Sequence, residues 1–122
     1  MNTLAIVGSQ AKAWNLGDEA RIKAVIWAMI QIFNPDEVIS GESPGGGVDI
    51  WAKEVCEEKD IPYRGYPAET RDWAGFRARN IAIATACKSL VAIRSSESKT
   101  FGSGWTAEYA KKKHRLVKVI TF

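Results

Sequence analysis

The chain has 122 residues, of which 46% are hydrophobic and 25% charged, and its formal net charge is +3. This length suits one domain with a single core over residues 1–122, and the apolar content is too high for a disordered protein. The longest strongly apolar stretch, 24–33, is too short to span a membrane, and no basic segment precedes an apolar run near Met1. We therefore expect a cytoplasmic protein without a membrane segment.

Strands and helices are predicted to alternate along the whole chain. A buried strand over 2–7 ends at Gly8, and Asp18 and Glu19 open a helix that runs to about Phe33. The later elements are a strand over 37–40, a helix over 48–59, a strand over 61–66, a helix from an N-cap at Thr70 or Asp72 to about Cys87, a strand over 89–94, a polar loop over 95–103, a helix over 104–113 and a strand over 116–120.

This alternation predicts a single Rossmann-like, doubly wound α/β domain. Its parallel sheet of about five strands has the expected order 3-2-1-4-5, with helices on both faces. In such sheets ligands bind outside the carboxyl ends of the strands, where the strand order reverses. The loops after the first, second and fourth strands are therefore the predicted functional region.

The first helix carries apolar residues on two sides. Its predicted core face consists of Ile22, Val25, Ile26, Met29, Ile30 and Phe33. The opposite side carries Ala24, Trp27 and Ala28, and a second apolar side indicates cover by another subunit. We therefore expect a homodimer.

The cysteines and the basic residues do not indicate a metal site. Cys56 and Cys87 stand singly in apolar helical patterns, without the partners that a zinc site needs, so we expect buried thiols, no metal and no cofactor. Much of the basic excess lies in 111–115, near the end of a predicted helix, where cations complement the helix dipole. A patch for nucleic acid or an acidic partner is the alternative interpretation.

Glycine-rich loops follow the first two strands. Gly8 comes directly after a buried strand, where the missing side chain either forms a turn or lets the backbone approach a ligand. The loop over 41–47 has four glycines before a helix, so its N–H groups and the helix dipole favour a phosphate or carboxylate. It has neither the Walker A pattern nor the GxGxxG spacing. Asp49 either caps the helix or accepts hydrogen bonds from a ribose.

A third glycine-rich loop, 102–104, opens the helix after the fourth strand, and Glu108 lies one turn further on as an acid or base, or as a solvated glutamate. On the preceding helix Arg77 and Asn80 share a face, which suits phosphate recognition, while Arg79 is expected to point elsewhere. Trp14, Phe101 and Trp105 are candidates for stacking a base. The candidate ligand-binding residues are Gly8, Ser9, Gln10, Gly41, Glu42, Ser43, Gly45, Gly46, Gly47, Asp49, Arg77, Asn80, Gly102, Ser103, Gly104 and Trp105.

Four short motifs occur in one order over nearly the whole chain: Ser40-Gly41, Gly47-Val48-Asp49, Arg79-Asn80 and Gly102-Ser103-Gly104. Together they resemble the SLOG superfamily, a Rossmann-like group that includes the DprA/Smf DNA-processing proteins, the lonely-guy (LOG) phosphoribohydrolases and the YspA/cpYpsA-related proteins. The YspA-like branch is the most similar. This resemblance implies binding of a nucleotide or another phosphorylated small molecule.

The LOG enzymes cleave the N-glycosidic bond of a nucleoside monophosphate with a Gly-Gly-x-Gly-Thr-x-x-Glu loop and an upstream arginine. By this resemblance Arg79 and Glu108 are the catalytic pair if the chain is an enzyme. Phe101 and Trp105 replace a glycine and the threonine of that loop, and Asn80 stands where those enzymes often have lysine. Nucleotide binding or sensing is therefore the first hypothesis, LOG-like hydrolysis the alternative, and single-stranded DNA binding of the DprA type the third.

Overall fold

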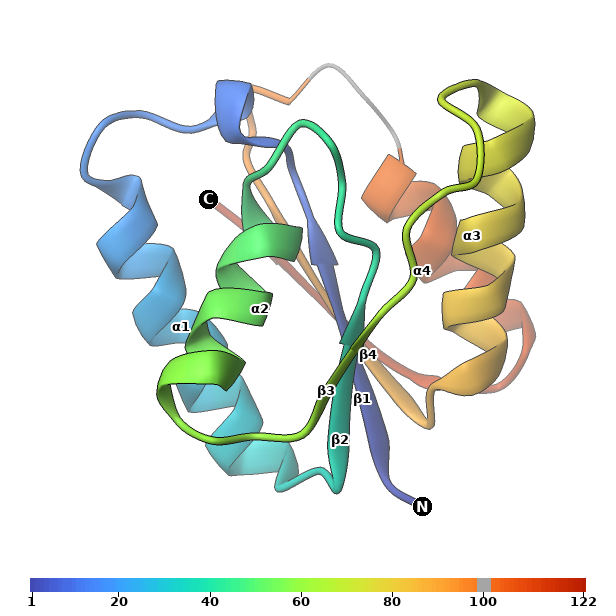
Figure 1. Cartoon of the computed structure of the whole chain (residues 1–122), viewed down its shortest axis with the longest axis horizontal. Helices are drawn as coiled ribbons and strands as arrows, with labels where there is room; N and C mark the ends of the chain where they lie inside the picture. Colours follow the sequence, from blue (N-terminus) through green and yellow to red (C-terminus); the bar gives the residue numbers. More distant parts are fainter. Residues whose placement is uncertain (99–101) are drawn as a thin grey trace.

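The computed structural model describes residues 1–98 and 102–122. Phe101, considered above for base stacking, and part of the loop expected over 95–103 lie outside the described residues. The predicted fold is confirmed: a parallel five-stranded sheet in the order β3-β2-β1-β4-β5 lies between two helical layers (Figure 1). In the described part of the chain, no helix combines the length and apolar character needed to cross a bilayer.

The elements follow the predicted alternation closely. They are β1 (Thr3–Gly8), η1 (Ala11–Ala13), α1 (Asp18–Phe33), β2 (Glu37–Ser40), α2 (Val48–Glu58), β3 (Tyr63–Gly65), α3 (Trp73–Ala86), β4 (Ser89–Arg94), α4 (Gly102–Lys112) and β5 (Leu116–Thr121). Asn34, at φ 46°, ends α1 in the left-handed region. At the start of α3, the Asp72 carboxylate accepts a hydrogen bond from the Gly75 N–H at 2.9 Å, as an N-cap does.

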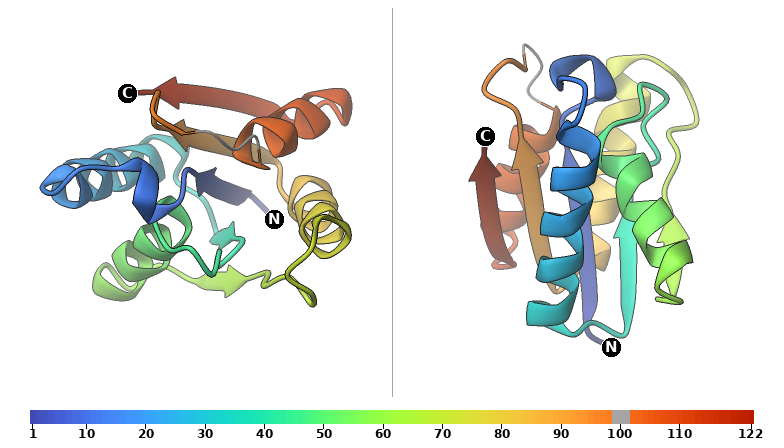
Figure 2. Two further views of the ribbon diagram at one scale, coloured as in Figure 1. Left: turned by 90° about the horizontal axis from the view of Figure 1, so that it is seen from above. Right: turned by 90° about the vertical axis from the view of Figure 1, so that its left-hand side faces the viewer.

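Alternating side chains of the sheet build two separate cores. Figure 2 (left) shows α1 and α2 on one face of the sheet and α3 and α4 on the other. Leu4 and Ile6 of β1 belong to the core cluster with α1 and α2, whereas Ala5 and Val7 belong to the cluster with α3 and α4. Because successive strand residues point to opposite faces, a fully buried strand needs apolar residues at every position. This explains the continuous apolar run of β1. Gly8 lies at the carboxyl end of β1, beside Val48 at the start of α2.

Two details differ from the sequence-based expectation. The strand β3 covers only Tyr63–Gly65 instead of 61–66, because Pro62 has no N–H to donate and the Ile61 N–H donates to the Cys56 carbonyl oxygen at the end of α2. The short helix η1 was not predicted; the Ala13 N–H closes it by donating to the Gln10 carbonyl oxygen at 3.0 Å.

The outer side of α1 is only partly as expected. Ala24 and Ala28 are exposed, but Trp27 is half-buried and packs against the core on the α1 and α2 side. The Lys59 ammonium lies 5.2 Å from the centre of the Trp27 ring. The reason is that α2 lies alongside α1, so the residues beyond its C-terminal end cover this indole.

Candidate ligand-binding site

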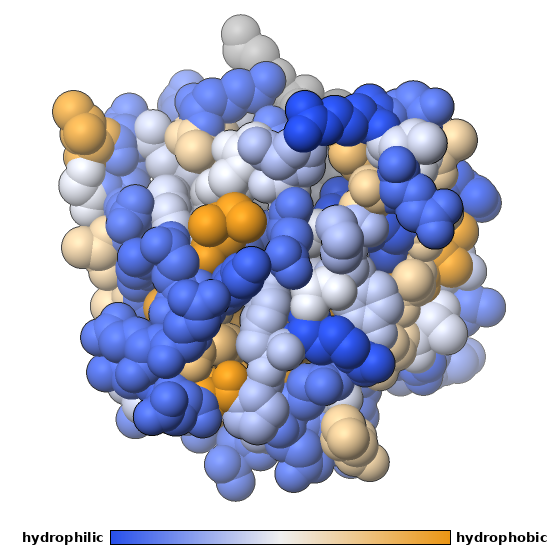
Figure 3. All heavy atoms as spheres, in the orientation of Figure 1, coloured by the Kyte–Doolittle hydropathy of each residue, from blue (hydrophilic) through white to orange (hydrophobic). Residues whose placement is uncertain are grey.

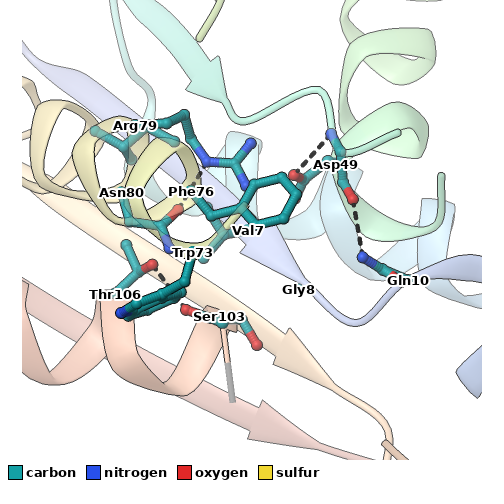
Figure 4. Close-up of a pocket in the computed structure, with 13 residues that line it drawn as sticks. Val7, Gly8, Gln10, Asp49, Trp73, Phe76, Arg79, Asn80, Ser103 and Thr106 are labelled. Carbon is teal, nitrogen blue, oxygen red and sulfur yellow. Dashed lines mark hydrogen bonds between the residues drawn. The ribbon is translucent and has the colours of Figure 1, made fainter. Parts of the chain in front are cut away.

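A pocket of about 210 Å³ opens at the carboxyl edge of the sheet, between α3 and α4 (Figure 4). Its floor is formed by Val7 and Gly8 at the end of β1, with Ile83 of α3. One side is formed by the loop after β2 and the start of α2, which supply Ser43 and Asp49. The loops after β1 and β2 and the first turns of α4 therefore meet at one pocket.

The loops after β1 and β2 are joined by hydrogen bonds. The Ala11 N–H donates to the Gly45 carbonyl oxygen at 3.1 Å, and the Val48 N–H donates to the Ser9 carbonyl oxygen at 3.2 Å. The Gln10 amide donates to the Ser43 hydroxyl at 3.3 Å. This interlocking holds the start of α2, and with it Asp49, at a defined place beside the pocket.

The glycines at 45–47 serve this loop contact and do not line the pocket. A Cβ atom on Gly47 would lie 2.3 Å from the Ser9 carbonyl oxygen, and one on Gly45 would lie 2.6 Å from the Gln10 side chain. Sequence reasoning attributed these glycines to close approach of a ligand. In the structure these glycines instead allow the loop after β1 to approach closely, and none of them lines the pocket.

Asp49 contributes a buried carboxylate to the pocket. The residue is only 5% exposed, and its Oδ2 accepts a hydrogen bond from the Ser43 N–H at 3.2 Å. Its Oδ1 has no hydrogen-bond partner among the described residues, since the nearby Ser40 hydroxyl donates to the Ile6 carbonyl oxygen. Burial raises the pKa of Asp49 to about 6, although the Arg79 guanidinium, the N–H groups of Ser43 and Gly8 and the Ser40 hydroxyl act in the opposite direction.

Arg79 reaches the same pocket from α3. Its Nε donates to the Asn80 Oδ1 at 2.7 Å, and its Nη1 donates to the Gly41 carbonyl oxygen. The guanidinium lies 5.6 Å from the centre of the Phe76 ring. Burial lowers the pKa of Arg79, and the Asp49 carboxylate partly offsets this effect. Arg79 therefore joins the loop after β2 to α3 and brings a positive charge to the Asp49 carboxylate.

Asn80 adds a hydrogen-bond donor to this end of the pocket. The residue is 5% exposed and lines the pocket, and its Oδ1 is occupied by Arg79. Within residues 1–98 and 102–122, its Nδ2 donates no hydrogen bond. Asp49 and Asn80 thus both line the pocket, the first with a carboxylate and the second with an amide.

The first turn of α4 forms the opposite side. Gly102, Ser103 and Thr106 line the pocket, and the Thr106 hydroxyl donates to the Gly102 carbonyl oxygen at 2.8 Å. Figure 4 shows Ser103 and Thr106 across the pocket from Asp49. The first N–H groups of a helix have no acceptor within that helix, and the helix dipole is positive there. This end of the pocket therefore favours an anion.

Aromatic residues surround the mouth. Trp73, 52% exposed, and Phe76 line the pocket. Trp105 lies behind Trp73, with the two ring centres 5.5 Å apart, and stacks on Tyr109. Trp14 packs against Trp51 and donates to the Ser9 carbonyl oxygen at 3.1 Å, so it supports the loop after β1. Trp73 and Phe76 are thus the aromatic side chains that a ligand in this pocket would contact.

The structure brings together about half of the residues proposed from the sequence. The proposed residues that line the pocket are Gly8, Gln10, Ser43, Asp49, Arg79, Asn80, Gly102 and Ser103. Those that lie outside its lining are Ser9, Gly41, Glu42, Gly45, Gly46, Gly47, Arg77, Gly104, Trp105 and Glu108. Lining residues that sequence reasoning missed are Val7, Trp73, Phe76, Ile83 and Thr106.

The expected positions of the two arginines of α3 were wrong: Arg79, and not Arg77, lies at the pocket. Arg77, expected to share the ligand face with Asn80, is exposed and has its guanidinium 5.8 Å from the centre of the Trp105 ring. Arg79, expected to point elsewhere, lies at the pocket. A signal was present in the sequence: positions 73, 76, 80 and 83 follow the three- and four-residue spacing of one helix face, and Arg79 flanks that face.

Glu108 lies away from the pocket lining. Its side chain is 68% exposed, and its carboxylate is 3.3 Å from the Lys111 ammonium. Gly104 is also on another side of α4, where a Cβ atom would lie 3.4 Å from the Arg94 guanidinium. Of the conditional catalytic pair, Arg79 therefore lies at the pocket and Glu108 does not. The carboxylate that lines the pocket is that of Asp49.

Neither a protein-family model nor a curated protein sequence matches this chain. Among residues 1–98 and 102–122, no group of three or more His, Cys, Asp or Glu side chains is placed to hold a metal ion. Cys56 and Cys87 are buried free thiols.

Proposed function

We propose that this chain binds a phosphorylated small molecule of the nucleotide class in the pocket between α3 and α4. The observation that carries the proposal is that the buried Asp49 carboxylate, whose Oδ1 has no partner among the described residues, lines a pocket whose other side is a helix N-terminus. An unpaired buried acceptor costs the folded protein free energy unless a ligand supplies a donor. The helix N-terminus favours a negative group on the same ligand.

The size of the pocket indicates how such a ligand lies. The volume of about 210 Å³ is below the roughly 300–1,000 Å³ that is usual for small-molecule sites. A nucleotide therefore fits partly inside the pocket, with its remainder at the mouth. Trp73, which is half exposed there, offers a flat apolar surface for a base. The resemblance to the SLOG superfamily supports the same class of ligand.

Hydrolysis of an N-glycosidic bond is the competing proposal. By resemblance it relies on Glu108, whose carboxylate is largely exposed and contacts Lys111. This placement favours binding or sensing over hydrolysis. Single-stranded DNA binding is third, since a net charge of +3 is modest for a protein that neutralises a phosphate backbone.

We also propose that the chain forms a homodimer through the outer side of α1. Ala24, Ala28 and Ile32 are exposed on this helix, and Ile32 is 70% exposed. The face seen in Figure 3 is mostly hydrophilic, with its apolar residues in separate spots. Exposed apolar residues along a helix are typical of a subunit contact.

Substitutions at Ser103 test the proposed binding site. In Ser103→Glu a carboxylate lies in the first turn of α4, where it suits the helix dipole but repels a bound phosphate. Ser103→Gln has nearly the same size without the charge.

We expect AMP, ADP-ribose, NAD or a cyclic nucleotide to raise the thermal midpoint of the wild type, since a ligand that binds only the native state stabilises it. Titration calorimetry with the ligand found should then show a loss of about tenfold or more for Ser103→Glu relative to Ser103→Gln. A flat response of the wild type across the panel, or equal affinities of the two variants, would contradict the proposal.

A further inference from the structure

The two edges of the sheet differ in how they are protected. The strand order places β3 at one edge and β5 at the other. The strand β3 has three residues and lies between Pro62 and Pro67, and prolines at an edge prevent another strand from pairing with it. The strand β5 has six residues and no proline. Both views of Figure 2 show β5 as the outermost element on its side of the described chain. Of the two edges, β5 is therefore the one that is open to a further strand.

The outer edge of β5 carries backbone groups without a partner strand. The N–H groups of Leu116 and Phe122 both donate toward β4, to carbonyl oxygens at 3.3 Å and 2.8 Å. Because the backbone groups of successive strand residues point to opposite edges, those of Val117, Val119 and Thr121 point away from β4. Among the described strands β5 pairs with β4 alone. The outward N–H and C=O groups match the backbone of an extended peptide.

Exposed apolar side chains lie on both faces of this edge. Leu116 is 64% exposed, and Val119 is 42% exposed. Residues two apart point to the same face, so Leu116 shares the face of Ile120, which packs against the core cluster of α1 and α2. Val119 shares the face of Val117, which packs against the cluster of α3 and α4. A strand added beside β5 would have a side chain opposite each of the two exposed residues.

The charge around this edge is positive. The exposed lysines beside the start of β5 and along it are Lys88, Lys112, Lys113 and Lys118. Lys111 is paired with Glu108 at 3.3 Å, but the ion pairs of the described residues include none of these lysines. The basic run over 111–115 therefore has charge beyond what its own neighbours balance. An acidic partner is attracted to this edge, whereas a second copy, which brings the same lysines, is repelled from it.

We propose that the outer edge of β5 binds an extended, acidic segment of a partner protein, which adds a further strand to the sheet. The backbone groups of β5 hold the segment, and the lysines select its charge. A nucleic acid would also attract the lysines, but it lacks the repeating N–H and C=O groups that match the edge, and it would leave Leu116 and Val119 uncovered. This surface is separate from the pocket, because no residue of β5 lines the pocket.

Fluorescence polarisation with labelled peptides tests this proposal on the full chain. The probe is a peptide of alternating Glu and Val, which forms an extended strand with one acidic face and one apolar face. A Glu-Pro peptide has the same charge but cannot pair as a strand, and a Lys-Val peptide forms the same strand with the opposite charge. We expect the Glu-Val peptide to bind about tenfold or more tightly than either control. Equal binding of the Glu-Val and Glu-Pro peptides, or no binding of the Glu-Val peptide, would overturn the proposal.

Two pairs of variants locate the contact on β5. Val119→Pro removes an outward N–H, which edge strands tolerate, and Val119→Thr keeps this N–H as the matched control. We expect Val119→Pro to bind the Glu-Val peptide about tenfold or more weakly than Val119→Thr. Lys118→Glu should also weaken binding, whereas Arg71→Glu makes the same change of charge at an exposed residue before α3 and should have less effect. Equal effects within both pairs would overturn the proposal, and the charge pair and the peptide series decide it if Val119→Pro does not fold.

Two further outcomes would assign the edge to another occupant. A single-stranded oligonucleotide that binds more tightly than the Glu-Val peptide, and is lost in Lys118→Glu, would overturn the proposal in favour of nucleic acid. A lower mass of Val119→Pro than of Val119→Thr in light scattering would show that the edge joins two copies of the chain. We expect the two variants to have the same mass.

Discussion

Asp49 is a residue whose burial lowers the stability of the fold but suits a binding site. Its carboxylate is buried, one oxygen is held by the Ser43 N–H, and the other lacks a partner in the described part of the chain. Burying a charged group costs free energy that Arg79 offsets only in part, and the raised pKa of Asp49 reports this balance. Such a residue is disadvantageous for stability alone, so a binding role explains its presence better than a capping role.

The pH dependence of stability tests this balance. The pKa of Asp49 is raised from an ordinary 3.8 to about 6 in the folded chain. The folded state therefore binds this proton more tightly than the unfolded state. The resulting stability is fully present below about pH 4 and is lost as the pH rises through about 6. We expect the free energy of unfolding of Asp49→Asn, relative to wild type, to rise by on the order of 2 kcal/mol between pH 4 and pH 7. Urea unfolding of both proteins across this range measures the difference, and a difference independent of pH would contradict the assignment.

Sequence reasoning identified Asp49 as a candidate but not its environment. The motif Gly47-Val48-Asp49 places an acid in the first turn of a helix, where capping and ligand binding are equally reasonable interpretations. What separates them is that Oδ1 has no partner among the described residues, and this depends on the loop after β2, on Ser40 and on Arg79 together. Contacts between segments so distant in sequence cannot be read from local spacing.

At the scale of elements, one side of the site is formed by the loops after β1 and β2, which hydrogen-bond to each other. The backbone hydrogen bonds between Ala11 and Gly45 and between Val48 and Ser9 hold η1 against the start of α2. Gly47 lies at φ 78° and ψ −142°, a conformation that side chains rarely adopt, with its Cα directed at the Ser9 carbonyl oxygen. The glycine-rich loop is thus rigidly supported, and its glycines fix the position of Asp49.

Paired alanine substitutions distinguish this role from direct ligand contact. Gly47→Ala introduces both backbone strain and a clash with the loop after β1, and we expect it to lower the free energy of unfolding by about 2–4 kcal/mol. Gly46, at φ 71°, has open space, since the nearest atom to an added Cβ would be 3.6 Å away. Gly46→Ala should therefore cost only about 1–2 kcal/mol. Denaturant unfolding measures both, and equal losses would show that the loop contact does not matter.

The order of elements was predictable from the sequence, whereas the faces of the helices were less so. Alternating apolar runs and helix signals fixed the five strands and the sheet order, because parallel strands need crossover helices. On α3 the expectation chose Arg77 over Arg79, although both flank the helix face formed by positions 76, 80 and 83. The short helix η1 escaped detection because Ala11–Ala13 carries no periodic pattern of its own.

At the scale of the whole molecule, the two helical layers differ in what they leave free. The layer of α3 and α4 borders the pocket together with the start of α2, while α1 and the rest of α2 cover the larger apolar side chains of the core. A dimer through the outer side of α1 would leave the pocket open, because α1 lies on the other face of the sheet (Figure 2). If both proposals hold, ligand binding and dimerisation are independent, and each can be removed without the other.

Substitution of matched exposed alanines tests the dimer. Ala28 of α1 and Ala78 of α3 are both exposed helical positions on opposite layers of the molecule. If the outer side of α1 forms the contact, Ala28→Arg places two like charges near the twofold axis of the dimer and should shift the protein to a monomer, while Ala78→Arg stays dimeric. Light scattering coupled to size exclusion measures the mass of each. Both variants should keep the wild-type affinity for the ligand, since neither alanine lines the pocket. A wild type that remains a monomer at high protein concentration would contradict the proposed dimer but not the proposed binding site. Loss of the dimer in both variants would show that the contact is not specific to α1.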